Sequence, residues 1–160
     1  MMTRIFMTRF SKYILSAFFL TIGVQTPVFA QRPPEMYVVM FRADWCAPCK
    51  IVEPNLDQAL KNLRNPDIKP IIIDISNPDI SLRSAHTAFD HNIVRQYNEW
   101  MGVTGFAAII DADTKNTLGC VNMTYDIGAM TNHIKNLKTY ARANQKSFDI
   151  TCPAPNPPVR

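Results

Sequence analysis

The sequence predicts an α/β domain in which helices flank a central, mixed four-stranded sheet. Apolar runs rich in β-forming residues recur along the chain and are typical of buried strands. Between the first three runs, apolar residues recur in steps of three and four, as in amphipathic helices. A short polar turn joins the last two runs, as in a hairpin. The expected order is β-α-β-α-β-β-α, in one domain without internal repeats.

The first strand is expected over residues 36–41, a continuous apolar run typical of a central strand. The helix after it covers residues 47–64, with Pro48 in its first turn and Pro54 inside it, where a proline bends a helix. The second strand covers residues 68–75. Because a helix connects these two strands, we expect them to be parallel.

A long second helix is expected over residues 82–101, closed by Gly102. Its apolar face consists of Leu82, Ala85, Phe89, Ile93, Tyr97 and Trp100. We expect Phe89 and Trp100 to lie in the core. The hairpin strands follow over residues 103–110 and 118–123, and then comes a last amphipathic helix from Ile127 to Ala141.

The first 30 residues have the three parts of a secretory signal peptide. A basic segment, 1–12, precedes an apolar run, 13–24, and small side chains follow up to a cleavage site after Ala30. The run is shorter than the ~20 residues that span a bilayer, although an uncleaved membrane anchor is the alternative. We therefore expect a signal peptide (1–30), a linker (31–35), a domain (36–150) and a proline-rich tail (151–160). The expected location is periplasmic or otherwise extracytoplasmic.

The positive charge of the chain belongs mostly to this leader. The formal net charge is +4, but Arg4, Arg9 and Lys12 all precede the first acidic residue, Glu35, and without them the net charge is +1. Such a balance gives no reason to expect nucleic-acid binding.

The chemistry is expected in residues 45–50, Trp-Cys-Ala-Pro-Cys-Lys, which follow a buried strand and open a helix. A helix N-terminus favours an anion, so Cys46 there can be a reactive thiolate. Cys49, less than one helical turn later, can resolve the mixed disulfide that Cys46 forms. The alternative for this pair is a metal site, but a zinc site usually takes four ligands and no second close cysteine pair exists. We expect neither a metal nor a cofactor.

Residues 45–50 resemble the active-site motif of the thioredoxin family. Pro54 matches the helix-bending proline of that family, and residues 102–106, Gly-Val-Thr-Gly-Phe, resemble its segment before the third strand. The resemblance covers residues 36–143 and implies a minimal thioredoxin fold, without the extra N-terminal strand and helix of full thioredoxins.

The resemblance also implies a function. The chain would be a thiol–disulfide oxidoreductase that reduces, oxidises or isomerises disulfides of exported proteins, with Trp45, Pro48 and Lys50 supporting the two cysteines. Its partners would be such proteins and a membrane or periplasmic redox partner. The alternative is a thioredoxin-like assembly or binding component of an envelope secretion or conjugation apparatus.

Two departures from the family pattern bear on the site. Ala107 stands where the family has a cis-proline, and a cis bond before a non-proline residue costs about 3–4 kcal/mol, so we expect a trans bond between Phe106 and Ala107. Met40 replaces a buried Asp that helps to deprotonate the resolving cysteine. Asp44 and Asp74 are candidate substitutes, although a solvated structural role is the simpler expectation for both.

The other two cysteines, Cys120 and Cys152, are expected to form a structural disulfide between the last strand and the tail, because an exported chain can keep disulfides. The alternative is a buried Cys120 with a free or intermolecular Cys152 thiol, since connectivity does not follow from sequence. His86, His91 and His133 are expected to have ordinary surface roles.

Overall fold

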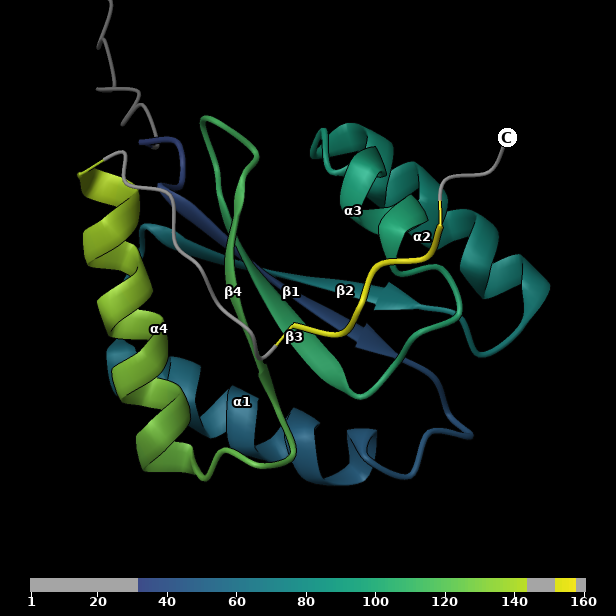
Figure 1. The fold of residues 1–160 in the computed structure, drawn as a ribbon, viewed down its shortest axis with the longest axis horizontal. Coiled ribbons are helices and arrows are strands. Elements are labelled where there is room, and N and C mark those ends of the chain that lie inside the picture. Colours follow the sequence, from purple (N-terminus) through teal and green to yellow (C-terminus); the bar gives the residue numbers. More distant parts are fainter. Residues whose placement is uncertain (1–31, 144–151, 158–160) are drawn as a thin grey trace, which may run out of the picture. The chain divides into compact units, whose positions relative to one another are not determined.

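The computed structural model describes residues 32–143 and 152–157. The predicted signal peptide and its cleavage site after Ala30 lie outside these residues. Within the described residues, four strands and four helices follow in the order β1-α1-β2-α2-α3-β3-β4-α4. The helices cover both faces of one sheet (Figure 1).

The sheet is mixed, with the strand order β2-β1-β3-β4. β1 (Met36–Arg42) pairs in parallel with β2 (Ile68–Asp74) and antiparallel with β3 (Phe106–Asp111). β4 (Thr117–Asn122) pairs antiparallel with β3. The parallel pair, the hairpin and the mixed four-stranded sheet expected from the sequence are all confirmed.

The helices divide between the two faces of the sheet (Figure 1). α1 (Cys49–Leu63) and α4 (Ile127–Arg142) pack on one face, and α2 (Pro78–Asp90) and α3 (Val94–Glu99) on the other. Alternate residues of β1 enter the two cores, as the period of a strand requires. Those facing α1 and α4 are Met36, Val38 and Met40; those facing α2 and α3 are Tyr37, Val39 and Phe41. In the described part of the chain, no helix is long and apolar enough to cross a membrane.

The prediction of a single helix over residues 82–101 is wrong, because the chain forms two helices there. Asn92 adopts a left-handed conformation, with φ 55°. The Asn92 and Ile93 N–H groups donate to the carbonyls of Phe89 and Ala88, at 3.0 and 2.8 Å. These two bonds form a Schellman motif, which ends α2 and turns the chain before α3.

The start of this region also differs, because α2 begins at Pro78 and not at residue 82. Asn77 caps the helix by accepting a hydrogen bond from the Ile80 N–H, and Pro78 is the first helical residue. The turn-forming pair Asn-Pro is therefore a helix start.

Two residues of the predicted apolar face lie at the surface. Phe89 is 75% exposed and Leu82 is 62% exposed, so their predicted place in the core is wrong. The buried residues of α2 are the small Ser84 and Ala88, which bring this helix close to the sheet. Trp100 is buried as predicted.

The third strand begins at Phe106, three residues later than predicted. Gly102 and Gly105 both have positive φ angles, +84° and +88°, which interrupt the extended chain before the strand. The remaining predicted boundaries agree with the structure to within two residues.

Candidate active site

Cys46 and Cys49 lie where the loop after β1 enters α1, and a disulfide joins them with 5.4 Å between their Cα atoms. Both are nearly buried, with exposed fractions of 4% and 2%. The Cys49 N–H points at the Cys46 sulfur, with 3.2 Å between nitrogen and sulfur. When the pair is reduced, this N–H and the positive end of the helix dipole favour a negative charge on Cys46.

Local backbone bonds hold the motif in place. The Cys46 N–H donates to the Ala43 carbonyl at 3.1 Å, which closes a turn before the helix. Pro48 is the N-cap of α1, with φ −58°, and its carbonyl accepts the N–H of Val52 at 3.0 Å. A proline suits this position because the first helical N–H groups have no partner within the helix.

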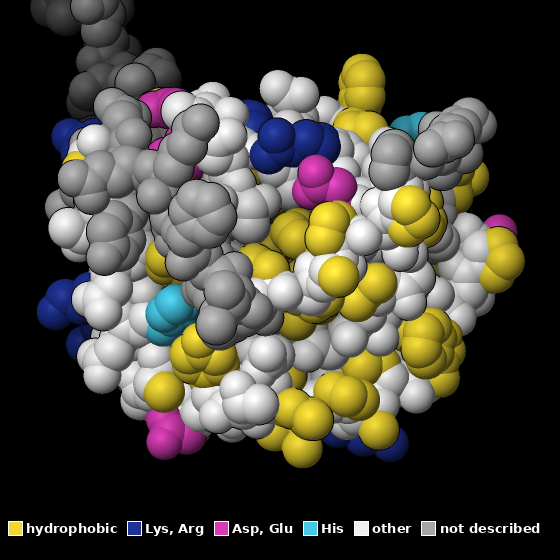
Figure 2. Space-filling view, in the orientation of Figure 1, with side chains coloured by type: hydrophobic (Ala, Val, Ile, Leu, Met, Phe, Trp, Pro, Cys, Tyr) yellow, Lys and Arg dark blue, Asp and Glu magenta, His cyan; other side chains and the backbone are white. Residues whose placement is uncertain are grey.

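Two predicted supporting residues face solvent. Trp45 is 63% exposed, and Lys50 is exposed in the first turn of α1. Ile51, in the first turn of α1, is another exposed apolar side chain. Hydrophobic side chains gather at this end of the molecule, where α1 begins and the loop before β3 turns (Figure 2).

The loop before β3 packs directly on the cysteine pair. The Gly105 N–H donates to the Phe41 carbonyl at 2.9 Å, and a Cβ at residue 105 would lie 2.8 Å from Pro48 Cβ and 3.5 Å from the Cys46 sulfur. Only glycine suits this position, because its φ is positive and a side chain would overlap Pro48.

Ala107, the residue at the family's cis-proline position, is completely buried in β3 opposite Met40 of β1. The peptide bonds of the described residues are all trans, which confirms the expectation for the Phe106–Ala107 bond. Met40 is buried as well, so the side chain at the family's Asp position adds an apolar surface to the core that contains Cys49.

A charged cluster that sequence reasoning missed is centred on Arg42, at the end of β1. Its guanidinium donates to Glu53 of α1 and to Asp44, each at 2.8 Å, and it also pairs with Asp74. Arg42 lies opposite Asp74 in the parallel register of β1 and β2. The signal in the sequence was an arginine and an aspartate at the carboxyl ends of two neighbouring parallel strands.

This cluster favours the ionised form of Asp74. Burial of Asp74 opposes ionisation, but hydrogen bonds from Ser76 and the charge of Arg42 outweigh it and lower the pKa of Asp74. Hydrogen bonds to Glu53 and Asp44 raise the pKa of Arg42 further above its usual value. Both acids considered as substitutes for the missing family Asp, Asp44 and Asp74, are therefore bound to Arg42.

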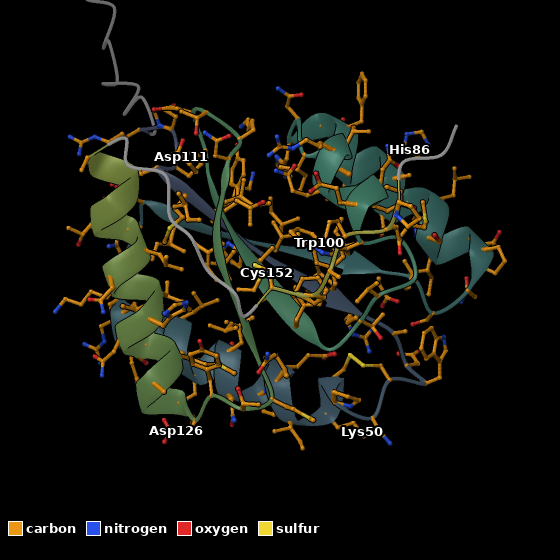
Figure 3. The ribbon with its side chains drawn as sticks, viewed as in Figure 1. Lys50, His86, Trp100, Asp111, Asp126 and Cys152 are labelled. Atoms are coloured by element: carbon orange, nitrogen blue, oxygen red, sulfur yellow. A yellow bond between two sulfur atoms is a disulfide. The ribbon has the colours of Figure 1, made fainter. Side chains whose placement is uncertain are left out.

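The second cysteine pair lies on the other face of the sheet. A disulfide joins Cys120, fully buried in β4, to Cys152 in the tail, with 4.9 Å between their Cα atoms. Cys120 belongs to the core under α2 and α3, against which Cys152 also packs. Figure 3 shows Cys152 and Trp100 near each other beside the sheet.

His86 lies on α2, His91 caps its C-terminus and His133 lies on α4. Burial and the charges of Lys69 and Lys115 lower the pKa of His91. Within residues 32–143 and 152–157, no group of three or more His, Cys, Asp or Glu side chains could hold a metal ion.

Solved structures similar to this chain have low sequence identity to it and TM-scores below 0.5. The thiol:disulfide interchange protein of the thioredoxin family from Chlorobium tepidum TLS is 20% identical, covers 65% of this chain and 80% of its own, and has a TM-score of 0.45. The oxidised form of mitochondrial thioredoxin 3 from Saccharomyces cerevisiae is 21% identical, covers 64% and 79%, and has a TM-score of 0.39. Oxidised thioredoxin from Plasmodium falciparum is 16% identical, covers 64% and 81%, and has a TM-score of 0.40.

No curated protein matches the sequence. Residues 28–101 match the family model described as Thioredoxin, a range that contains the Cys46–Cys49 pair and the elements from β1 to α3. The pair stands at the strand-to-helix junction, on a mixed sheet in the order β2-β1-β3-β4. Over residues 28–101, this chain is therefore similar to the thioredoxin family.

Proposed function

We propose that this chain is a thiol–disulfide oxidoreductase whose redox centre is the pair Cys46 and Cys49. The observation that carries the proposal is the disulfide at the N-terminal end of α1, with the Gly105 loop packed against it. A disulfide between residues three positions apart, at a strand-to-helix junction, fits a redox centre.

Reduction of a client would proceed in two exchanges. The Cys46 thiolate attacks one sulfur of the client disulfide, so that a Cys46–client disulfide forms and the other client sulfur leaves as a thiolate. The Cys49 thiolate then attacks the Cys46 sulfur, which releases the second client thiol. Two electrons pass to the client, and the Cys46–Cys49 disulfide remains. Oxidation of a client is the same sequence in reverse.

The order of attack follows from position. Cys46 precedes α1 and receives the Cys49 N–H, whereas Cys49 is the first residue of the helix and more buried. The exposed apolar side chains of Trp45 and Ile51, close to the pair in the sequence, give a client a surface to bind. Whether the chain acts as reductase, oxidase or isomerase depends on the reduction potential of the pair.

We further propose that the chain acts outside the cytoplasm, in the periplasm or an equivalent compartment, after cleavage near Ala30. The pattern of residues 1–30 supports export. The disulfide between Cys120 and Cys152 agrees with an oxidising compartment, where such bonds persist. Clients would then be disulfide-containing exported proteins, with a membrane or periplasmic protein restoring the redox state.

The proposal is tested by insulin reduction and by reactivation of a scrambled disulfide protein. Wild type should turn over, and both Cys46→Ser and Cys49→Ser should fall to background. Each variant is the control of the other, because both lose the disulfide but only Cys49→Ser keeps the attacking thiol. Mixed disulfides with clients should therefore accumulate in Cys49→Ser alone. Trapping in Cys46→Ser alone would reverse the roles, and an inactive wild type would favour the alternative of an assembly component.

A further inference from the structure

The tail makes specific contacts with the end of α3. The Trp100 indole N–H donates to the Pro153 carbonyl at 3.0 Å. Asn156 donates its backbone N–H to the Glu99 carbonyl at 2.6 Å and its side-chain amide to the Met101 carbonyl at 2.7 Å. Residues 152–157 thus run beside α3 (Figure 1) and contact Glu99 and Trp100 at its end and Met101, the first residue of the loop packed on the cysteine pair.

The tail is also anchored covalently. Cys152 is bonded to Cys120, which lies fully buried in β4 opposite Ala108 of β3. One end of the described tail is therefore fixed to the sheet, and Asn156 is fixed to the backbone on both sides of Trp100.

A continuous series of contacts leads from the tail to the redox pair. The Trp100 ring meets Phe41 and Phe106 edge-on, with ring centroids 5.7 and 5.4 Å apart, and Phe41 and Phe106 stack at 4.9 Å. The Phe41 carbonyl accepts the Gly105 N–H and lies 4.0 Å from the Cys49 sulfur. Gly105 in turn leaves no room for a Cβ between itself and Pro48, and such a Cβ would lie 3.5 Å from the Cys46 sulfur.

The loop between Trp100 and Phe106 needs such support. It contains two glycines with positive φ, at residues 102 and 105, and no proline follows it at residue 107. Its backbone is tied down by the bond from the Val103 N–H to the Trp100 carbonyl, 3.0 Å, and by the bond from Gly105 to Phe41. The tail adds a third bond, from Asn156 to the Met101 carbonyl.

We propose that residues 152–156 are a positioning strap that holds loop 101–105 in the conformation that receives a client beside Cys46. The strap does not touch the reacting sulfurs. It acts through the Met101 carbonyl and the Trp100 ring, with the Cys120–Cys152 disulfide as its anchor. This inference rests on the proposed oxidoreductase function, because it assigns the strap an effect on client affinity.

The test compares Asn156→Ala with Asn136→Ala, a matched change at an exposed residue of α4. Loss of one side-chain hydrogen bond should raise KM for insulin about fivefold in Asn156→Ala, with kcat unchanged. Amide hydrogen exchange at residues 103 and 105 should accelerate by a similar factor. Asn136→Ala should change neither quantity. Equal exchange rates in the two variants, or faster exchange without a change in KM, would overturn the proposal.

Two further variants separate the contacts. Trp100→Phe keeps an aromatic ring but loses the bond to Pro153. Cys152→Ser releases the anchor of the whole strap. KM and the exchange rates should therefore rise more in Cys152→Ser than in Asn156→Ala. A smaller rise in Cys152→Ser would contradict the role of the anchor. Hydrogen exchange does not depend on turnover. An inactive wild type would therefore contradict the proposed function. Unchanged exchange in Asn156→Ala would contradict the strap proposal alone.

Discussion

The two faces of the sheet carry one disulfide each, and the two bonds differ in what they join. On the α1 and α4 face, Cys46–Cys49 links residues three apart within one loop and helix start. On the α2 and α3 face, Cys120–Cys152 links residues 32 apart, a strand and the tail. The first bond constrains almost nothing beyond itself, whereas the second fixes a segment that crosses the fold.

The surroundings of the bonds differ in the same way. The Cys46 sulfur receives a backbone N–H and contacts a glycine loop. Cys120 lies in the middle of a hydrogen-bonded ladder, without exposed surface. A redox-active disulfide joins cysteines that are close in sequence and lies where a helix begins. A structural disulfide closes a long loop and is anchored in the core.

The largest expected difference is in the free energy of unfolding. Chain-entropy arithmetic for a 32-residue separation gives roughly 3–4 kcal/mol for the Cys120–Cys152 bond, against about 2 kcal/mol for Cys46–Cys49. Urea unfolding of Cys152→Ser should therefore show the larger loss, and Cys49→Ser the smaller. In the presence of a strong reductant, Cys152→Ser and wild type should become equally stable. A larger loss in Cys49→Ser would reverse the comparison.

The packing of the loop before β3 against the Cys46–Cys49 pair can be tested by adding a methyl group at its glycines. Gly105→Ala should destabilise the fold by about 1–3 kcal/mol more than Gly102→Ala and slow client reduction, because its Cβ would overlap Pro48 beside Cys46. Gly102 is the matched control, because its φ is also positive but no atom lies within 4 Å of an added Cβ. Thermal unfolding and the insulin assay measure both effects. Equal losses in the two variants would mean that loop strain, and not contact with the redox pair, accounts for the requirement for glycine.

The smallest expected effect concerns the ion pairs of Arg42, which attach β2 and α1 to the redox end of β1. Folding lowers the pKa of Asp74, so its contribution is complete above the unfolded value of about 3.9 and is lost as the pH falls through the folded value. Asp74→Asn should cost about 1 kcal/mol at neutral pH, and the difference from wild type should shrink in acid below that range. Urea unfolding at both pH values checks this. A difference that stays constant with pH would show that the charge of Asp74 does not contribute.

Most of the fold could be predicted because burial dominates it. Strands β1 and β3 are apolar up to their last residues, Arg42 and Asp111, and such runs are typical of buried strands. The prediction failed between Asn77 and Trp100 because the structure there depends on single residues. Asn77 and Asn92 begin and end α2 through local hydrogen bonds, which a periodic pattern over residues 82–101 hides.

The site divides similarly. The Cys46–Cys49 pair could be located from one short segment, because its chemistry is local. Arg42 could not, since its partners come from a loop, from α1 and from β2, and only the parallel register brings Asp74 beside it. The contacts of Asn156 with residues 99 and 101 depend on where the tail returns, which no local pattern specifies.

Placing the two disulfides in separate cores has a consequence for self-reaction. Thiol–disulfide exchange requires the attacking thiolate to reach a sulfur of the target bond. Reduced Cys46 lies in the core under α1 and α4, whereas Cys120 lies in the core on the opposite side of the sheet. The hydrogen-bonded sheet lies between the two pairs, so the Cys46 thiolate cannot reach the sulfurs of the Cys120–Cys152 disulfide in the folded domain. One domain can therefore hold the Cys46–Cys49 pair in its reduced form and the Cys120–Cys152 disulfide intact at the same time.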